Sequence, residues 1–471
     1  MQVSVPFDNS YARLPDAFYT RLAPTPVRAP QLIAYNDDLA ALLGLPDAGA
    51  EDRARVFSGS RVPEGAAPLA QLYAGHQFGN YNPQLGDGRA ILLGEVVGTD
   101  GVRRDIQLKG SGPTPYSRMG DGRAWLGPVL REYVISEAMH ALGVPTTRAL
   151  AATLTGENVV RESLLPGAVL TRVAASHLRV GTFQIFASRG QTEALKELTQ
   201  YAIERHWPDA ERPMDLLRAV CAAQAELVAN WMSFGFIHGV MNTDNCTISG
   251  ETIDYGPCAF IDDFHEDTVF SSIDQHGRYA FSNQPRIIVW NMAQFATALL
   301  QQLDDPADSV DEATEIVHAM PDQIEAAWTR RFGAKIGLSD PSAADDAALA
   351  RDLLQIMQAQ GADFTNTFDA LARGDARDQF VDRDAFDTWS ERWNARIADE
   401  ADPQAVMQAA SPRVIPRNHR IEEMISAAVN GDYAPFERLQ NALRDPFGTA
   451  DTGLMRPPTA AQRVPATFCG T

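Results

Sequence analysis

Alternating apolar and polar residues, separated by glycines, predict a β-rich region in the first half of the chain. The runs from Gly86 to Val96 and from Asp105 to Lys109 alternate as half-buried strands do, and the glycines around them are typical of tight turns. Two more strand-like runs extend from Arg148 to Leu154 and from Ala168 to Val173. We therefore expect several strands joined by tight turns.

Helical periodicity accounts for much of the remaining apolar sequence. Apolar residues recur at roughly helical spacing from Pro128 to Leu142. The stretch from Met214 to Phe234 is also helical in pattern, with Gly235 as a C-cap candidate, and an apolar helix is expected from about Ile288 to Leu300. The part beyond residue 304 is rich in Ala and Asp at helical spacing, which predicts a helical C-terminal region.

The first 65 residues read as an N-terminal extension that packs against the body of the protein. They contain several prolines and a short helical patch from Asp37 to Leu43. A chain of 471 residues is long enough for two or three domain-sized units, or for one two-lobed enzyme with extensions.

Composition and charge narrow the classes of partner. The chain is 45% hydrophobic and 21% charged, with a formal net charge of -21, which disfavours nucleic-acid polymers and anionic membranes as partners. Any bound phosphate would need a local basic pocket. No apolar run approaches the roughly 18 residues of a spanning helix, and the N-terminus shows no signal or transit pattern, so a cytoplasmic protein is the simplest prediction.

The cysteines do not form a recognisable framework. Cys221, Cys246, Cys258 and Cys469 make no C-x-x-C pair, which argues against a structural zinc site or a disulfide scaffold. The first three are expected to be buried thiols, whereas Cys469 lies two residues from the C-terminus, where burial is least expected.

The most informative pattern is His238-Gly-Val-Met-Asn-Thr-Asp-Asn245 followed by Asp254-Tyr-Gly256. Its spacing matches the protein-kinase pair H-R-D-x-x-x-x-N and D-F-G, in which the Asn and the second Asp hold the metal on the phosphates. Val240 occupies the position of the usual first Asp. The pattern therefore predicts a phosphate and metal site, and it disfavours ordinary phosphoryl transfer.

Asn245 and Asp254 supply the hard oxygen ligands that Mg²⁺ or Mn²⁺ accepts when nucleotide phosphates complete the shell. Asp244 is the candidate to accept a proton from an attacking hydroxyl, because Val240 cannot. Without the match to the kinase spacing, the same residues would be interpreted as ordinary turn and loop-capping residues. His238 is predicted to be an internal hydrogen-bonding histidine.

A second group of residues is typical of phosphate contacts in a small lobe. Glycines such as Gly86 and Gly88 allow backbone N–H groups to approach an anion, and Lys109 ends the following strand-like run. Glu132 on the predicted helix could pair with Lys109, although Glu137 on the same helix could be confused with it. A G-x-G pair alone is more often a hairpin turn.

Two further basic or glycine-dense stretches complete the candidate set. Gly120-Asp-Gly-Arg123 is either part of the pocket or a long surface loop. Arg172 and Arg179 carry the fork of donors that suits paired phosphate oxygens, but two arginines at this spacing can equally be surface residues.

Taken together, these segments resemble the selenoprotein O family, kinase-like proteins that act as AMP transferases. The segments that carry the resemblance are Tyr73 to Gly79, Leu85 to Arg89, Gln107 to Gly112, Gly120 to Arg123, Arg172 to Gly181, His238 to Asn245, Asp254 to Pro257, His276 to Tyr279 and Thr467 to Thr471.

The resemblance implies an α+β, protein-kinase-like two-lobed fold. Its expected parts are an N-terminal extension (1–65), a small lobe with the Gly-rich loop (66–190), a large lobe with the metal and catalytic loops (191–330) and a helical C-terminal region with a Cys-containing tail (331–471). In some relatives a cysteine of the activation segment pairs with the C-terminal one. Here residues 260–285 contain no cysteine, which leaves Cys469 without that partner unless Cys258 substitutes.

The resemblance also implies roles for individual residues and a reversed nucleotide with its γ-phosphate buried. Asp244 would be the general base, Asn245 and Asp254 the metal ligands, and Glu132 the partner of Lys109. The expected nucleotide-binding residues are Gly86, Gly88, Arg89, Lys109, Asp121, Gly122, Arg172, Arg179 and Asp254.

The leading hypothesis is transfer of AMP from ATP to Ser, Thr or Tyr hydroxyls of proteins, with release of pyrophosphate and with Mg²⁺ or Mn²⁺. Transfer of UMP from UTP is a close variant. Conventional γ-phosphoryl transfer is a rival that Val240 disfavours, and a non-catalytic nucleotide-binding scaffold is a rival from another class.

Overall fold

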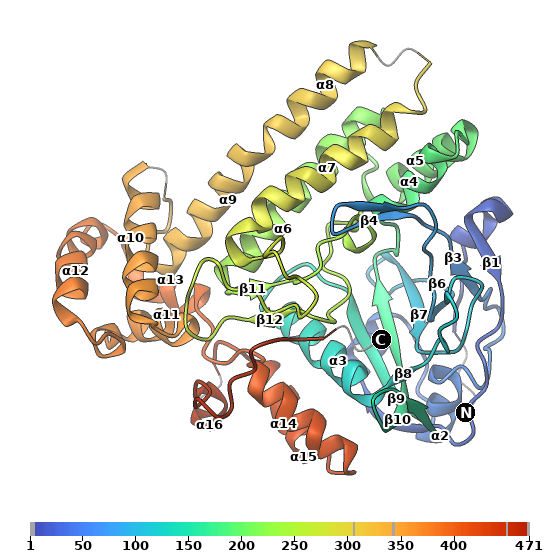
Figure 1. Ribbon diagram of the computed structural model, residues 1–471, viewed down its shortest axis with the longest axis horizontal. Helices are drawn as coiled ribbons and strands as arrows, with labels where there is room; N and C mark the ends of the chain where they lie inside the picture. The colour runs from blue at the N-terminus through green and yellow to red at the C-terminus, as the bar shows by residue number, and fades with distance from the viewer. Residues whose placement is uncertain (1–4, 305–306, 342–343, 449–450, 469–471) are drawn as a thin grey trace.

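An eight-stranded antiparallel sheet lies on one side of the molecule (Figure 1). The computed structural model describes residues 5–304, 307–341, 344–448 and 451–468. The strand order is β1-β3-β6-β7-β10-β9-β2, and β8 pairs with β10. The strands are β1 (Tyr19–Arg21), β2 (Gln31–Tyr35), β3 (Leu69–Gln71), β6 (Ala90–Val97), β7 (Arg103–Lys109), β8 (Ala124–Trp125), β9 (Arg148–Val160) and β10 (Leu164–Ala174).

The centre of the sheet confirms the strands predicted from alternation. The strand β7 lies between β6 and β10, with Lys109 opposite Ala90 on one side and Leu170 on the other. Because side chains alternate along a strand, Gln107 and Lys109 lie on the same face of β7. Arg172 of β10 is the cross-strand partner of Gln107, so it shares that face.

The helix predicted from Pro128 to Leu142 covers this sheet. Helix α3 (Leu126–Ala141) contacts β9 and β10, and it buries Leu130, Tyr133 and Met139. Helices α14 (Asn418–Val429) and α15 (Ala434–Leu443) pack on α3 from its other side. The sheet, α3 and this helical pair therefore form successive layers of one hydrophobic core (Figure 1).

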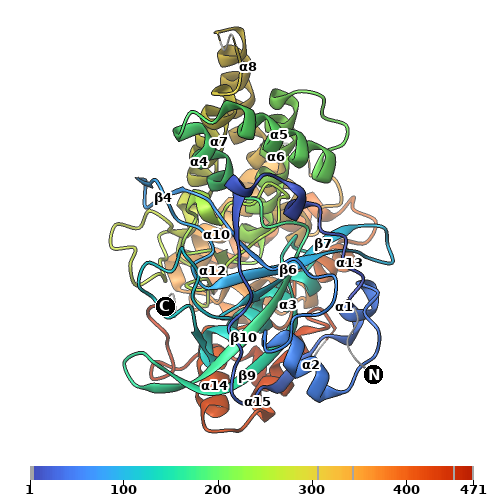
Figure 2. The ribbon, with the colours of Figure 1, turned by 90° about the vertical axis from the view of Figure 1, so that its right-hand side faces the viewer.

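The N-terminal residues form both edges of the sheet, which the sequence patterns did not predict. Strand β1 pairs with β3 at one edge, and β2 pairs with β9 at the other. The connecting residues 22–30 cross the sheet between the two edges (Figure 2). On the way, Thr25 N–H donates to Ser111 O (2.9 Å) and Ala29 N–H to Thr155 O (3.0 Å). The helical patch predicted after residue 36 is present as α1 (Asp37–Leu42).

A set of mainly α-helical segments follows the sheet, as the periodicity predicted. The long helix α6 (Pro213–Ser233) packs against α7 (Gln284–Leu300) and α9 (Met320–Lys335). Gly235, at φ 66°, follows the C-cap of α6. The other α-helices before residue 320 are α2 (Ala50–Phe57), α4 (Val180–Ser188), α5 (Thr192–His206) and α8 (Ala307–His318).

Two small two-stranded ribbons frame the loops near the site. The first joins β4 (Gly75–Gln77) to β5 (Asn80–Asn82), and the second joins β11 (Phe236–Ile237) to β12 (Ala259–Phe260). Short 3-10 turns are η1 (Tyr11–Arg13), η2 (Asp16–Phe18), η3 (Thr243–Asn245), η4 (Phe281–Asn283) and η5 (Ala376–Gln379).

The C-terminal part is helical, in agreement with its periodicity. Its remaining helices are α10 (Ala344–Gln360), α11 (Phe364–Arg373), α12 (Arg383–Ile397), α13 (Pro403–Ala410) and α16 (Thr452–Met455). Lys335, at the end of α9, is buried and donates to Ala410 O (3.0 Å) at the end of α13. Its ammonium lies 4.9 Å from the ring centre of Phe368 and 5.3 Å from that of Phe234.

The C-terminal tail returns to the middle of the molecule. Thr467 N–H donates to Phe270 O (2.7 Å), and Ser272 N–H donates to Thr467 O (3.0 Å). The Thr467 hydroxyl also donates to Pro257 O. Cys469 lies outside the described residues. No helix in the described part of the chain is long and apolar enough to cross a membrane.

Candidate functional site

One cavity of about 810 Å³ brings together almost all the residues singled out in the sequence. Its lining combines glycine-rich loops, the cations Lys109 and Arg172 of the sheet, and the loop that contains Asp244 and Asn245. Glu132 lies behind the wall, within hydrogen-bond distance of Lys109. The predicted residues that line the cavity are Gly86, Gly88, Arg89, Lys109, Asp121, Gly122, Arg172, Arg179, Asp244, Asn245 and Asp254.

Lys109 is held between two carboxylates. Its Nζ lies 2.6 Å from Glu132 Oε2 and also pairs with Asp254 Oδ1. Glu137, the alternative partner, instead pairs with Arg148 (2.7 Å). Five residues along a helix rotate a side chain by about 140° relative to the first, so Glu132 and Glu137 cannot face the same strand. Glu132, and not Glu137, is therefore the partner of Lys109 in this structure.

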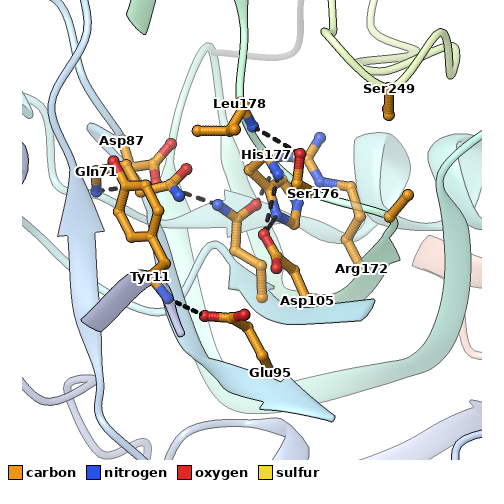
Figure 3. A network of polar contacts seen from close by, with 12 residues as sticks. Tyr11, Gln71, Asp87, Glu95, Asp105, Arg172, Ser176, His177, Leu178 and Ser249 are labelled. Atoms are coloured by element: carbon orange, nitrogen blue, oxygen red, sulfur yellow. Dashed lines mark hydrogen bonds and ion pairs between the residues drawn. The ribbon is translucent and has the colours of Figure 1, made fainter. Parts of the chain in front are cut away.

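Arg172 is buried in the same wall, and both of its terminal nitrogens are hydrogen-bonded. Its Nη1 donates to Glu132 Oε1 (3.1 Å), and its Nη2 donates to Gln107 Oε1 (2.7 Å). The Gln107 amide in turn donates to Asp87 Oδ2 (3.1 Å). Figure 3 shows Arg172 and Asp87 as parts of this network. A chain of hydrogen bonds thus links the glycine loop, the sheet and α3.

Arg179 lies at the start of α4 and is also buried. Its guanidinium carbon lies 4.5 Å from the ring centre of Tyr73, and its Nη1 is 3.7 Å from Asp87 Oδ1. Its Nη1 also donates to His177 O (3.2 Å), which leaves other donors of this guanidinium for an anion in the cavity.

A buried polar network lies next to these arginines, and Figure 3 shows Glu95, Asp105 and His177 as parts of it. Asp105 accepts from the backbone N–H (2.9 Å) and Nδ1 (2.8 Å) of His177, two residues before Arg179. Arg205 bridges Asp105 and Glu95, and Glu95 also accepts from Tyr11 N–H. Burial lowers the pKa of His177 to about 4, so its ring is neutral at ordinary pH.

Asp254 occupies a strained backbone position at the cavity wall. Its φ is 70°, a region that costs a non-glycine residue on the order of 1 kcal/mol or more. Burial opposes ionisation of Asp254, but the positive charges of Lys109 and Arg172 outweigh it and hold the pKa of its carboxyl far below the usual range. Asp254 is therefore an anion in this site.

Asp244 lies in the turn η3, and its two oxygens have different surroundings. Its Oδ2 accepts from the Gln77 amide (3.1 Å), whereas Oδ1 is shielded from solvent and has no hydrogen-bond partner among the described residues. Burial raises the pKa of Asp244 to about 6, although the Gln77 hydrogen bond opposes this. Asp244 lines the cavity, and a carboxylate with one unpartnered oxygen can accept a proton or bind a cation.

The β4–β5 ribbon holds the turn that carries Asp244. His76 N–H donates to Thr243 Oγ1 (2.7 Å), and Phe78 N–H donates to Asn242 Oδ1 (3.1 Å). A Cβ at Gly75 would lie 2.8 Å from Asp244 Oδ1, so only glycine fits there without displacing the carboxylate. The segment from Tyr73 to Gly79 contributes to the family resemblance, but the sequence assigned no role to its residues.

The glycine loops need glycine for steric reasons. Gly86 has φ 113°, and a Cβ there would lie 2.6 Å from the Tyr116 ring. Gly122 has φ 65° and lies against the backbone of Gly112. Asp121, predicted to contact nucleotide, pairs with Arg161 (2.8 Å), an arginine of the cavity lining that sequence reasoning missed.

The oxygen atoms around the turn η3 could hold a divalent cation only together with oxygen atoms of a bound ligand. Asn245 donates its Nδ2 to Val240 O (3.1 Å), and its amide oxygen is free of protein hydrogen bonds within the described ranges. Asp254 uses one oxygen for Lys109. No group of three or more His, Cys, Asp or Glu side chains that could hold a metal occurs among the described residues. Phosphate oxygens would have to complete such a shell.

His238 and the cysteines behave as expected. His238 is buried, and its Nε2 hydrogen-bonds to Ile253 O (2.9 Å), which confirms the prediction of an internal histidine. Cys221, Cys246 and Cys258 are buried free thiols, as predicted. Burial raises the pKa of Cys258 to about 12, so it is not a reactive thiolate in this conformation.

A separate cavity of about 630 Å³ lies among α6, α7, α9 and α10. Its lining is mainly apolar and includes Phe281, Ile324 and Trp328, and none of the predicted site residues. We therefore place the functional site in the charged cavity that contains Lys109, Asp244 and Asp254.

Comparisons with known proteins show which family the chain belongs to. The family model described as protein adenylyltransferase SelO matches residues 2–444. The protein nucleotidyltransferase YdiU of Roseobacter denitrificans is 76% identical over 471 residues, and that of Ruegeria sp. (strain TM1040) is 67% identical over 473 residues. The YdiU protein of Jannaschia sp. is 56% identical over 482 residues, and each of these matches covers 100% of both chains.

These matches identify the chain as an enzyme of the nucleotidyltransferase class, as predicted. Within that class, it belongs to the SelO family, and the resemblance stated from the sequence motifs is confirmed.

Proposed function

We propose that this protein transfers AMP from ATP to Ser, Thr or Tyr hydroxyls of proteins and releases pyrophosphate. The observation that carries the proposal is that one cavity is lined both by Asp244, whose carboxylate has an unpartnered oxygen, and by the cations Lys109, Arg172 and Arg179. The family name and the motifs support adenylyl transfer in particular.

The position of the cations favours a nucleotide that enters with its triphosphate innermost. Arg172 and Arg179 are 3% and 4% exposed, so anionic groups bound to them would lie at the inner wall. In that orientation the γ-phosphate is buried, and the α-phosphorus lies nearer the opening. The absence of a carboxylate at Val240 is consistent with an acceptor that approaches from another direction than in a kinase.

Asp244 would act as the general base in this reaction. The acceptor hydroxyl oxygen forms a bond to the α-phosphorus, and the bond between that phosphorus and the bridging oxygen to the β-phosphate breaks. The hydroxyl proton moves to Asp244, and the electron pair leaves with pyrophosphate. Gln77 holds Oδ2, and Oδ1 has no hydrogen-bond partner among the described residues.

Asn245 and Asp254 would hold Mg²⁺ or Mn²⁺ together with the nucleotide phosphates, and the metal would neutralise charge on those phosphates. Lys109 remains positioned by Glu132 while it contacts a phosphate.

We further propose a kinase-like two-lobed arrangement with the boundaries expected from the sequence. Residues 66–190 contain the sheet core and α3, and residues 191–330 contain the helices around the catalytic turn. The extension (1–65) and the C-terminal region (331–471) would support these lobes. A cytoplasmic location, with neither nucleic-acid polymers nor membranes as partners, is part of the same proposal and is consistent with the net charge of -21.

Separately labelled nucleotides test the reaction. The purified chain is incubated with a cell lysate and with ATP labelled at the α or the γ position, and labelled UTP is included as a competing donor. We expect protein-bound label from α-labelled ATP and none from γ-labelled ATP. Label transferred from the γ position would establish a kinase instead, and preferential transfer from UTP would replace AMP by UMP.

The substitution Asp254→Ala separates an enzyme from a scaffold. It removes one metal ligand and one partner of Lys109, which keeps Glu132. We expect loss of label transfer with little change in the circular dichroism spectrum. Equal transfer by the variant and the wild type would instead favour a non-catalytic role for this cavity.

A further inference from the structure

A second polar cavity adjoins the nucleotide cavity. It has a volume of about 620 Å³, and it shares Phe78 and Ile273 with the 810 Å³ cavity. One wall comes from residues 273–283 and the other from the first half of α7, which contributes Arg286 and Trp290. We call this cavity the acceptor groove.

Two arginines dominate the groove. The guanidinium carbon of Arg278 lies 4.9 Å from the centre of the Trp290 ring, and Arg286 is exposed. Neither forms an ion pair with a carboxylate in the described part of the chain. In contrast, Arg205 and Arg417 each pair with two carboxylates. The two arginines therefore give the groove a positive charge, although the net charge of the whole chain is -21.

The acidic residue of the groove does not neutralise these arginines. Both oxygens of Asp274 accept backbone N–H groups, from Arg278 (2.9 Å) and Tyr279 (2.7 Å). Asp274 is buried and closes the loop that presents the arginine, while His276 beside it is exposed. The groups that the groove presents to a ligand are therefore mainly cationic and aromatic side chains.

The groove is connected to the turn that carries Asp244. Asn242 Oδ1 accepts from the Tyr279 hydroxyl (2.6 Å) and from Phe78 N–H (3.1 Å). The rings of Phe78 and Tyr279 are also in edge contact, with centres 5.1 Å apart. Hydrogen bonds and a ring contact thus join the wall of the groove to the turn that carries Asp244. A chain segment lying in the groove would place a neighbouring side chain at the mouth of the nucleotide cavity.

We infer that the acceptor groove binds an extended segment of the protein substrate and selects acidic residues beside the modified hydroxyl. Carboxylates of the segment would pair with Arg278 and Arg286, and an apolar neighbour would pack on Ile273, which is 55% exposed. The inference rests on the proposed transfer to protein hydroxyls. Charge complementarity carries it, because an acidic segment would be repelled by most of the remaining surface.

Matched peptides test the inference. Each pair has the same length and a single central Ser, Thr or Tyr, flanked by Asp and Glu in one peptide and by Lys in the other. With α-labelled ATP, we expect a KM for acidic peptides about five- to tenfold lower than for lysine peptides. Equal use of both peptides, or preference for lysine, would overturn the inference and leave the proposed reaction intact.

Charge reversal in the groove provides the second arm. Arg286→Glu changes an exposed residue, and we expect it to raise the KM for acidic peptides about tenfold and to lower it for lysine peptides. Arg28→Glu is the control, because Arg28 is exposed and lines neither cavity. Equal effects of the two substitutions would show that net charge, and not the groove, sets the preference.

Peptide binding separates failure of the inference from failure of the proposed function. Fluorescence anisotropy of labelled peptides reports binding whether or not transfer occurs. If no peptide is modified, tighter binding of the acidic peptide by wild type than by Arg286→Glu would still support the groove, and the reaction would be rejected. Equal binding by both proteins would reject the groove.

Discussion

At the scale of single residues, Asp244 is distinguished by the different environments of its two oxygens. Substitution by Asn keeps the shape and the contact with Gln77 but removes the proton acceptor. We expect Asp244→Asn to lower kcat by about 10² to 10⁴, the range of general-base catalysis, with a smaller effect on ATP affinity. Single-turnover label transfer and calorimetric ATP binding measure the two quantities. Wild-type kcat in the variant would remove Asp244 from the mechanism.

Gln77 is expected to act through Asp244. Its amide donates to Oδ2, so Gln77→Leu frees the carboxylate to rotate. Loss of one hydrogen bond to a charged group corresponds to about 1.5–3 kcal/mol, or roughly ten- to a hundredfold in kcat. The matched control is Gln84→Leu, since Gln84 contacts Arg189 on the surface. An equal loss of kcat in both variants would show that the loop as a whole, and not this hydrogen bond, matters.

Sequence reasoning located most of the cavity but not its supporting residues. Fixed spacing within one loop brought Asp244, Asn245 and Asp254 into the candidate set, because a motif encodes local geometry. Asp87 and Gln107 lie in segments that carry the family resemblance, but the sequence assigned them no role, since their roles depend on Arg172 of another strand. Long-range hydrogen bonds of this kind cannot be derived from spacing along a chain.

At the scale of elements, the junction of α9 and α13 contains the buried Lys335, which pairs with no carboxylate in the described ranges. Burial lowers the pKa of Lys335 from 10.5 to about 7. Between those two values the unfolded chain binds more protons than the folded one, so this site becomes more favourable to folding as the pH rises. The faces of Phe234 and Phe368 offset part of the cost of burying the charge.

The substitution Lys335→Met tests this junction. We expect the variant to exceed wild type in free energy of unfolding at pH 7, and this excess to shrink by about 2 kcal/mol at pH 9. Urea denaturation at both pH values measures the change. The control Lys196→Met removes an exposed lysine and should show a constant difference. A constant difference for Lys335→Met would contradict the lowered pKa.

Helices were easier to predict than strands for a physical reason. The core-facing periodicity of α3, α6 and α7 is contained within each segment, and all three form close to the predicted limits. Strands β1 and β2 are short, and their pairing partners β3 and β9 are far away in sequence. Their formation depends on sheet edges that the local pattern does not describe.

At the scale of the whole molecule, the C-terminal tail stabilises the segment that lines the acceptor groove. A chain ending at Arg463 would lose the two backbone hydrogen bonds between Thr467 and the segment around Ser272. Two such bonds correspond to about 2 kcal/mol, so we expect cleavage of residues 266–283 in limited proteolysis to accelerate roughly thirtyfold.

Thr467→Val is the matched control for this truncation. It removes the hydroxyl contact with Pro257 O but retains the backbone bonds, so the acceleration should be smaller. Unchanged cleavage in the truncated chain would show that the tail does not restrain the groove.

The crossing of the sheet by residues 22–30 limits how far its edges can move apart. Six interstrand spacings separate β1 from β2, which amounts to about 29 Å. The ten Cα–Cα steps from Arg21 to Gln31 reach about 35 Å at full extension. The connecting segment is therefore only a few ångströms longer than the distance it spans. An outward movement of one edge strand would stretch this segment and pull on the other edge strand. The width of the sheet is thereby capped by covalent bonds as well as by side-chain packing.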